Sequence, residues 1–149
     1  MSDQLRLTVA AQDVLLAWAA PRCSLDGDWP DGSEAMAVID GTTIKAVVVM
    51  NNRIGEGSMM HIASDGSHSW ANRRILGGIF GYVFIFKGLH AVTAIVNVYN
   101  VPALVMALKL GFQFEGRKRS IYGPQDDDII LGMIRPECHW IKDAEHGQT

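Results

Sequence analysis

The sequence predicts a mixed α/β (α+β) fold: a mostly antiparallel sheet with one central parallel strand pair and flanking helices. Two strand-like runs flank the dipeptide Asp40-Gly41, which is typical of a tight hairpin. Hydrophobic residues then recur at helical spacing from Ser69 to Lys87, and a β-branched run follows at Ala91 to Val96. A strand, a crossover helix and a second strand within about 40 residues predict a parallel pair with a right-handed crossover.

The first half of the chain is expected to hold one helix and three strands. The region up to Ala20 is interpreted as an amphipathic helix rather than a secretion signal, because polar residues interrupt it. The helical spacing is clearest from Thr8 to Ala19, and Pro21 is expected to end the helix. Three antiparallel strands of a meander should follow, at Glu34 to Ile39, Ile44 to Asn51 and Ser58 to Ala63.

The second half is expected to alternate helices and strands. Glycines within the Ser69 to Lys87 helix destabilise a helix, so they predict a close approach to a sheet or a ligand. Asn100-Val101-Pro102 is typical of a helix start, and Gly111 of a helix end. The last two strands are expected at Phe112 to Tyr122 and at Asp128 to Arg135.

Composition narrows the class of protein. The chain has 149 residues, of which 48% are hydrophobic, so we expect a single domain over residues 1–141 and a polar C-terminal tail over 142–149. Its two cysteines lie far apart with no ligand spacing, which predicts neither a disulfide framework nor a metal site and indicates a cytoplasmic protein. A net charge of -3 with scattered basic residues disfavours nucleic acid as a partner, and no membrane span is expected.

The segment between the third strand and the following helix is a candidate anion site. Backbone N–H groups at a helix N-terminus attract anions, and Arg73 and Arg74 add positive charge in the first turn, where the helix dipole disfavours cations. A phosphate-bearing ligand would explain that placement. A solvated helix face would explain it equally well.

Two segments resemble a known family. Asn100-Val101-Pro102-Ala103, then Leu108-Lys109-Leu110-Gly111-Phe112 and Glu115-Gly116-Arg117, are similar to the signature of the GNAT acetyltransferase superfamily, closest to the branch that acetylates ribosomal-protein N-termini. The ending Gly132 to Trp140, with Trp70 and Arg73, resembles small GNAT-like proteins often encoded by bacteriophages. The resemblance covers roughly Glu34 to Trp140.

The resemblance implies that acetyl-CoA lies in a wedge between the two parallel strands. Backbone groups of Met60, Ile62 and Ala63 would then line the pantetheine and polarise the thioester carbonyl. The pyrophosphate would lie at the start of the next helix, close to Ser69, Asn72, Arg73 and Arg74.

The sequence departs from the family pattern at two places. The usual glycine-rich turn is replaced by Ser67 to Asn72, which holds no glycine. Ala107 stands where many members carry the tyrosine that protonates the CoA thiolate, so no general acid is carried over.

Amine transfer also needs a group that removes the ammonium proton. His61, the only histidine within an expected core strand, is the first candidate, with Glu56, Glu115 and Asp128 as alternatives. His61 is as readily a packed strand residue. Asn100 is the second candidate catalytic residue, although helix capping alone would explain it. The hydroxyls of Tyr99, Ser120 and Tyr122 are further candidates to reach the thiol, although a strand-surface position would also explain each of them.

These residues lead to one function and one alternative. The expected function is an N-acetyltransferase that moves acetyl from acetyl-CoA to a primary amine, such as a protein N-terminus, a lysine or a small amine, by direct transfer in a ternary complex. The alternative is a GNAT-fold binding or scaffold protein without catalysis, of phage type and acting on a host protein. An exposed strand edge near the last hairpin also favours a homodimer.

Overall fold

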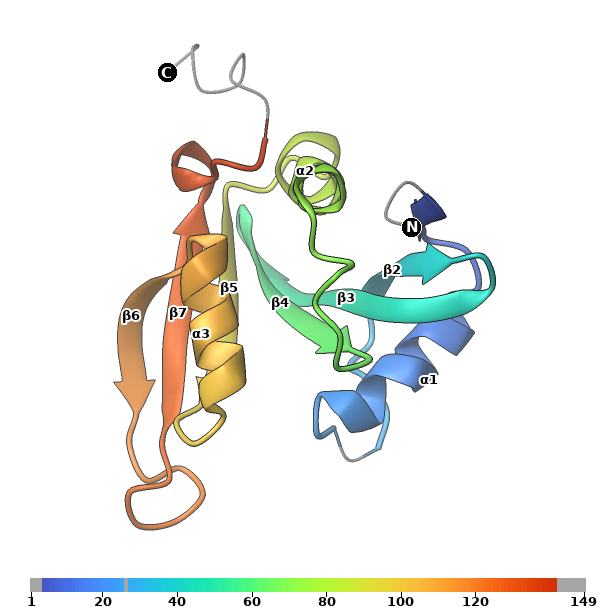
Figure 1. Ribbon diagram of the computed structural model, residues 1–149. Coiled ribbons are helices and arrows are strands. Elements are labelled where there is room, and N and C mark those ends of the chain that lie inside the picture. The colour runs from blue at the N-terminus through green and yellow to red at the C-terminus, as the bar shows by residue number, and fades with distance from the viewer. Residues whose placement is uncertain (1–3, 26, 142–149) are drawn as a thin grey trace.

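The computed structural model describes residues 4–25 and 27–141. The polar tail expected at 142–149 lies outside the described residues. Figure 1 shows the sheet dividing into two halves that diverge from each other, with β4 at the edge of one half and β5 at the edge of the other.

The described strands form one sheet in the order β1-β2-β3-β4-β5-β7-β6. Every neighbouring pair is antiparallel except β4 and β5, which are parallel. This arrangement confirms the predicted mixed sheet with one central parallel pair. The strand bounds are β1 (Leu5–Thr8), β2 (Glu34–Asp40), β3 (Thr43–Ile54), β4 (Gly57–Ser64), β5 (Ala91–Asn97), β6 (Gln113–Lys118) and β7 (Asp128–Ile134).

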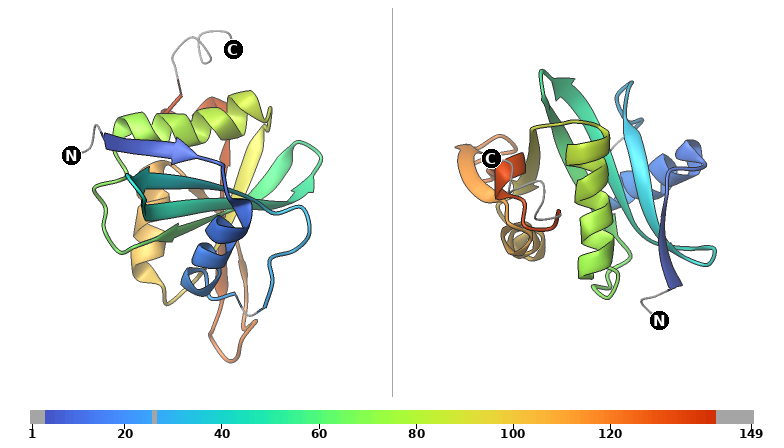
Figure 2. Two further views of the ribbon diagram at one scale, coloured as in Figure 1. Left: turned by 90° about the vertical axis from the view of Figure 1, so that its right-hand side faces the viewer. Right: turned by 90° about the horizontal axis from the view of Figure 1, so that it is seen from above.

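Helices cover both faces of this sheet. On one face α1 (Gln12–Arg22) packs on small and β-branched side chains of β2, β3 and β4. The opposite face carries α2 (Arg73–Gly81), its π-helical continuation η2 (Tyr82–Phe86), and α3 (Val101–Leu110), all packed on the larger of two hydrophobic clusters. Figure 2 shows α1 and α2 on opposite sides of the sheet. A short 3-10 turn, η3 (Arg135–Glu137), follows β7.

The prediction for the N-terminal region was wrong in two respects. The helix does not begin at Thr8, because Leu5–Thr8 form β1, which pairs antiparallel with β2, and α1 starts only at Gln12. Ala11, in the left-handed conformation with φ 56°, separates the two elements. Pro21 does not end the helix either; it lies in the last turn, where a missing N–H removes only one helical hydrogen bond, and the helix ends at Arg22.

The close approach predicted from the glycines of α2 is confirmed at Gly77 and Gly78, whereas nothing lies within 4 Å of a Cβ atom built on Gly81. A Cβ atom built on Gly78 would lie 2.5 Å from Cδ1 of Leu7, and one on Gly77 would lie 3.1 Å from the carbonyl oxygen of Trp140. In Figure 2, α2 runs alongside β1. The absence of side chains at these positions therefore lets the helix lie directly against the edge of the sheet and the C-terminal segment.

The expected strand from Phe112 to Tyr122 is too long, since β6 ends at Lys118. Ser120, with φ 55°, turns the backbone away from the strand, and Tyr122 lies in the β6–β7 loop. A bulge forms at Glu115-Gly116, where the register between β6 and β7 shifts between Phe114 and Gly116. Both helix-end predictions hold: Asn100 caps α3, and Gly111, with φ 111°, ends it.

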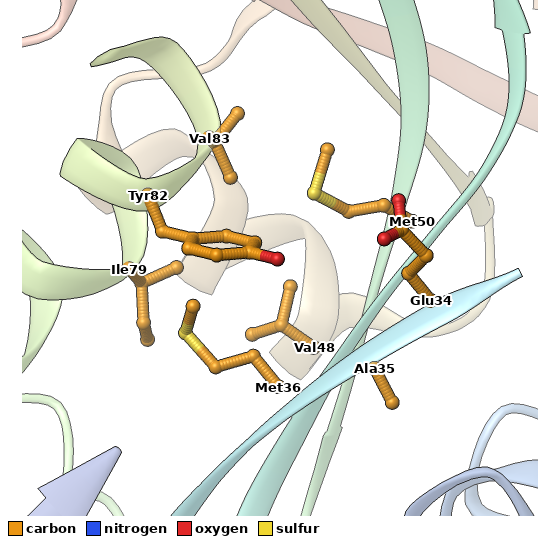
Figure 3. A pocket seen from close by; sticks show the side chains of 8 residues that line it. All are labelled: Glu34, Ala35, Met36, Val48, Met50, Ile79, Tyr82 and Val83. Atoms are coloured by element: carbon orange, nitrogen blue, oxygen red, sulfur yellow. The ribbon is translucent and has the colours of Figure 1, made fainter. Parts of the chain in front are cut away.

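A small hollow lies between η2 and the strands β2 and β3. Figure 3 shows the Tyr82 ring directed across it toward the strand side chains. The hollow measures about 10 Å³, which is about the space that one water molecule needs. It has no room for a substrate. Among the described residues, moreover, no helix is long and apolar enough to cross a membrane.

Candidate active site

A large cleft opens where the two parallel strands separate. β4 and β5 pair only at Gly57 with Ala91, Ser58 with Val92 and Met59 with Thr93. Both strands continue beyond these pairs, so β4 from Met60 onward has no strand partner on the side of β5. The resulting cleft has a volume of about 480 Å³ and is lined by residues of β4, β5, α3, the end of α1 and the β6–β7 loop.

The side chains of β4 alternate between the two faces of the sheet. Met60 and Ile62 lie on the face of α2 and α3, where they belong to or pack against the larger cluster. His61 and Ala63 point to the opposite face, on which α1 packs. Of the β4 residues singled out in the sequence, Met60, His61 and Ile62 line the cleft, whereas Ala63 is buried beside α1 and is not among its lining residues.

His61 is held by two neighbours on the α1 face. Its ring packs edge-on against Trp29, with the centroids 5.3 Å apart, and its Nε2 lies 3.1 Å from Oδ1 of Asn51. Because an amide oxygen only accepts, Nε2 carries the proton of the neutral ring and Nδ1 keeps a lone pair. Burial lowers the pKa of His61 below its usual value of 6.5. The imidazole is therefore neutral at neutral pH, which is the form that accepts a proton.

The β5 side of the cleft holds Asn100 and Ala107. The side-chain oxygen of Asn100 accepts a hydrogen bond from the backbone N–H of Ala103, at 3.3 Å, and so caps the N-terminus of α3. Asn100 also lines the cleft, as does Ala107, which is 7% exposed. The methyl group of Ala107 supplies no proton. Ala107 therefore leaves this part of the cleft wall without a proton donor.

A phenol and a carboxylate lie together at the same cleft. The hydroxyl of Tyr122 donates a hydrogen bond to Oδ2 of Asp128 at 2.9 Å, and both residues line the cleft. The pKa of the Tyr122 phenol is raised, and this hydrogen bond is the largest cause of the rise. The phenol therefore stays protonated at neutral pH. Sequence reasoning considered Asp128 and Tyr122 separately, and no local pattern indicates that they form a pair.

The four residues predicted to hold the pyrophosphate lie together around the start of α2 but do not line this cleft. Asn72 caps the helix by accepting from the N–H of Ile75 at 2.9 Å, and Ser69 is exposed. Arg74 donates to the carbonyl oxygen of Leu5 at 3.0 Å, and the guanidinium of Arg73 lies 5.7 Å from the centre of the Trp140 ring. Both arginines contact protein groups, and both remain exposed.

Trp70 fixes the loop that precedes these residues. The indole is almost wholly buried, and its N–H donates to the carbonyl oxygen of Ser67 at 3.0 Å and to Oγ of Ser64 at 3.3 Å. Lys45 holds Asp65 of the same loop in a 3.0 Å ion pair. The turn that lacks the usual glycines is therefore ordered by side chains.

Sequence reasoning also missed the contribution of α1. Arg22, Cys23 and Ser24, at the end of that helix, line the cleft. Burial raises the pKa of the Cys23 thiol, which favours the neutral thiol. No motif indicates this placement, because it follows from the packing of α1 across the ends of β2, β3 and β4.

Comparisons with solved structures agree with this fold. No protein-family model and no curated protein matches the sequence. Among solved structures, mutant forms of the spermidine/spermine N-acetyltransferase SpeG from Vibrio cholerae match with a TM-score of 0.72 at 16% identity, covering 89% of this chain and 95% of that one. The ribosomal-protein-S18-alanine N-acetyltransferase from Escherichia coli matches with a TM-score of 0.67 at 15% identity, covering 87% and 93%. The likeness, at this level of identity, establishes that the chain has the fold of the GNAT acetyltransferases.

Proposed function

We propose that the protein is an N-acetyltransferase that moves the acetyl group of acetyl-CoA to a primary amine by direct transfer in a ternary complex. The observation that carries this proposal is the unpaired edge of β4 beyond Met59, which faces a cleft of about 480 Å³. A strand edge without a partner binds extended, amide-bearing ligands by adding a strand. The pantetheine arm, with two amides, is such a ligand.

In this arrangement the thioester lies between the diverging strands. Backbone groups of Met60 and Ile62 pair with the pantetheine, and N–H groups of that edge polarise the carbonyl oxygen on which negative charge develops. The apolar side chains of Met60 and Ile62 keep the arm out of water. Asn100 lines the opposite wall of the cleft, where the thiol end of the pantetheine arm would lie.

Acetyl transfer to an amine needs a group that removes a proton from the acceptor ammonium, and His61 is placed to do so. The acceptor ammonium first loses one proton, and the lone pair that is freed attacks the thioester carbon. The C–S bond breaks, the nitrogen loses its second proton as the amide forms, and the departing thiolate takes up one proton, so the net products are the amide, the CoA thiol and one released proton. A neutral imidazole with Nδ1 available is suited to receive the first proton, directly or through water. His61 is therefore proposed as the general base.

The phosphates of CoA belong at the start of α2 in this proposal. The first turn of a helix leaves backbone N–H groups without helical partners, and Ser69, Asn72, Arg73 and Arg74 surround that turn. The exposed arginines lie outside the cleft, so the charged end of CoA would extend over the protein surface.

The acceptor is open to three classes of amine: a protein N-terminus, a lysine side chain or a small amine. The matched structures are named for two of these classes, spermidine and the alanine of ribosomal protein S18. Their names support amine acetylation on this fold.

One specific observation favours the alternative of a binding or scaffold protein. Arg74 and Arg73 contact Leu5 and Trp140 rather than an open cradle, and no glycine-rich turn is present. In that case the cleft would serve recognition of another molecule, without acetyl transfer.

Ligand-induced stabilisation separates the two functions. A ligand at 100 times its dissociation constant stabilises the folded state by about 2.7 kcal/mol, which at about 2–4 °C per kcal/mol raises the Tm by several degrees. We expect this shift with millimolar acetyl-CoA and with CoA. An unchanged Tm with both would favour the scaffold.

A further inference from the structure

One carboxylate stands alone in the cleft. Among the described residues that line it, Asp128 is the only acidic side chain, and it is 6% exposed. Tyr122 is the only donor that the described residues offer to its carboxylate, and it contacts Oδ2 alone. A buried carboxylate with so few donors lacks the compensation that buried charges normally have.

The neighbouring acidic residues lie outside the cleft. Asp127 receives the guanidinium of Arg117 at 2.7 Å, and Asp126 accepts from the amide of Asn97 at 2.7 Å. Of the three consecutive aspartates, Asp128 is the one that lines the cleft and can meet a cation there.

The β6–β7 loop is built to hold the phenol beside Asp128. Ser120 and Gln125 adopt the left-handed conformation, with φ 55° and 62°. Ser120 N–H donates to Asp127 Oδ1 at 2.7 Å, and the Tyr99 hydroxyl donates to the carbonyl of Gln125 at 3.1 Å. Backbone strain of this kind persists only where the surroundings fix it. The loop thus presents Tyr122 to the cleft in a defined position.

Asp128 and His61 lie on the same face of the sheet. Ile129, the next residue of β7, belongs to the larger cluster on the α2 and α3 face, so the Asp128 side chain points to the opposite face. His61 points to that face from β4. The two polar groups flank the cleft from its two walls, away from α3, which lines the other side.

We infer that Asp128, positioned by Tyr122, binds the ammonium group of the acceptor amine. This inference rests on the proposed function and deepens it, since it assigns a residue of this chain to the ammonium group of the acceptor. The carboxylate would receive charge-assisted hydrogen bonds from the ammonium before the proton passes to His61. Tyr122 occupies Oδ2 and so leaves Oδ1 for the ligand.

The test uses butylammonium as the probe and the full chain saturated with CoA, so that no turnover occurs. Binding is followed by the backbone amide resonances of the β6–β7 loop and β7 in two-dimensional NMR spectra. Butanol serves as the uncharged probe of matched shape. We expect saturable shifts with butylammonium and none with butanol.

Three variants assign the effect to the carboxylate. Asp128→Asn should weaken butylammonium binding about 10- to 100-fold, because a charge-assisted hydrogen bond is lost. Tyr122→Phe should raise KM for an amine acceptor several-fold with kcat nearly unchanged, as expected of a positioning residue. Asp128→Glu, which keeps the charge, should bind more tightly than Asp128→Asn and so exclude a folding defect as the cause. Asp31→Asn, at an exposed loop carboxylate outside the cleft, is the control and should match the wild type.

The outcomes separate the two proposals. Equal binding by wild type and Asp128→Asn, or equal shifts with butanol, would overturn the inference even if CoA binds. A protein that binds butylammonium at Asp128 but shows no interaction with CoA would retain the ammonium site and refute the acetyltransferase.

Discussion

His61 gives the most detailed prediction, because its removal has separate effects on rate, pH dependence and stability. His61→Gln keeps an N–H donor for Asn51, whose Oδ1 lies 3.1 Å from Nε2, but it has no group that accepts a proton. A general base contributes about 10² to 10⁴ in rate, so kcat should fall by that factor, with little change in KM for acetyl-CoA.

The effect of pH follows from the direction of the shift. Burial lowers the pKa of His61 below 6.5, and the base works when neutral, so kcat/KM should rise with pH through an acidic limb that lies below pH 6.5. The variant should lack that limb. A group with a lowered folded-state pKa contributes stability above its unfolded value, and this contribution is lost as pH falls through the folded-state value. Wild-type Tm should therefore fall more steeply than that of the variant below pH 6.5.

The cost in stability should be small. The variant loses the edge-on contact between His61 and Trp29, which is worth about 0.5–1.5 kcal/mol, or roughly 1–6 °C in Tm. The assay is CoA release from acetyl-CoA and a saturating amine between pH 5 and 9. His90→Gln, at an exposed histidine outside the cleft, is the matched control. A variant with wild-type kcat and the same acidic limb would show that His61 only packs in the sheet, and the search for the base would move to Glu56, Glu115 and Asp128.

Two further predictions concern the loop and helix beyond β4. The double change Arg73→Ala and Arg74→Ala should weaken CoA binding, measured by calorimetry, by about 1.5–3 kcal/mol per phosphate contact. Binding of pantetheine, which lacks these phosphates, should stay unchanged in the same assay. Equal losses for both ligands would mean that the arginines act on folding. The pKa of Asp65 is lowered to about 2, mainly by the hydrogen bond with the Ser67 side chain and further by the ion pair with Lys45. The ionised carboxylate therefore stabilises the folded state above about pH 4, and this stabilisation is lost as the pH falls toward 2. The Tm of Asp65→Asn should therefore fall less between pH 4 and pH 2 than that of the wild type. The difference corresponds to at most about 1 kcal/mol of unfolding free energy, because solvent screens this partly exposed ion pair. The same fall in Tm for both proteins would contradict a stabilising role of Asp65.

The parts of the fold that could be predicted are those with long periodic patterns. The meander, the parallel pair and the capped helix α3 follow from alternating or helical spacing over many residues, together with Asn100 and Gly111 at the helix ends. The strand β1 was missed because its Leu5–Thr8 alternation covers only four residues and runs into the apolar residues of α1.

This miss also limited the prediction for the phosphate site. Arg74 bonds to the carbonyl of Leu5, and without β1 nothing in the sequence indicates that a protein group is near that side chain. The pair of Tyr122 and Asp128 is hidden for a different reason. It depends on a loop with left-handed residues, such as Ser120, that are not glycines, and sequence patterns do not reveal such conformations.

Acetyl-CoA is proposed to bind along the edge of β4 that has no strand partner beyond Met59. Hydrogen exchange of the full chain, with and without acetyl-CoA at 100 times its dissociation constant, tests it at the level of single amides. Binding along this edge should slow exchange of the cleft-facing amides between Met60 and Ser64, with smaller changes in β2, whose two edges are already paired to β1 and β3. Unchanged exchange along β4, or protection confined to a surface outside the cleft, would contradict it.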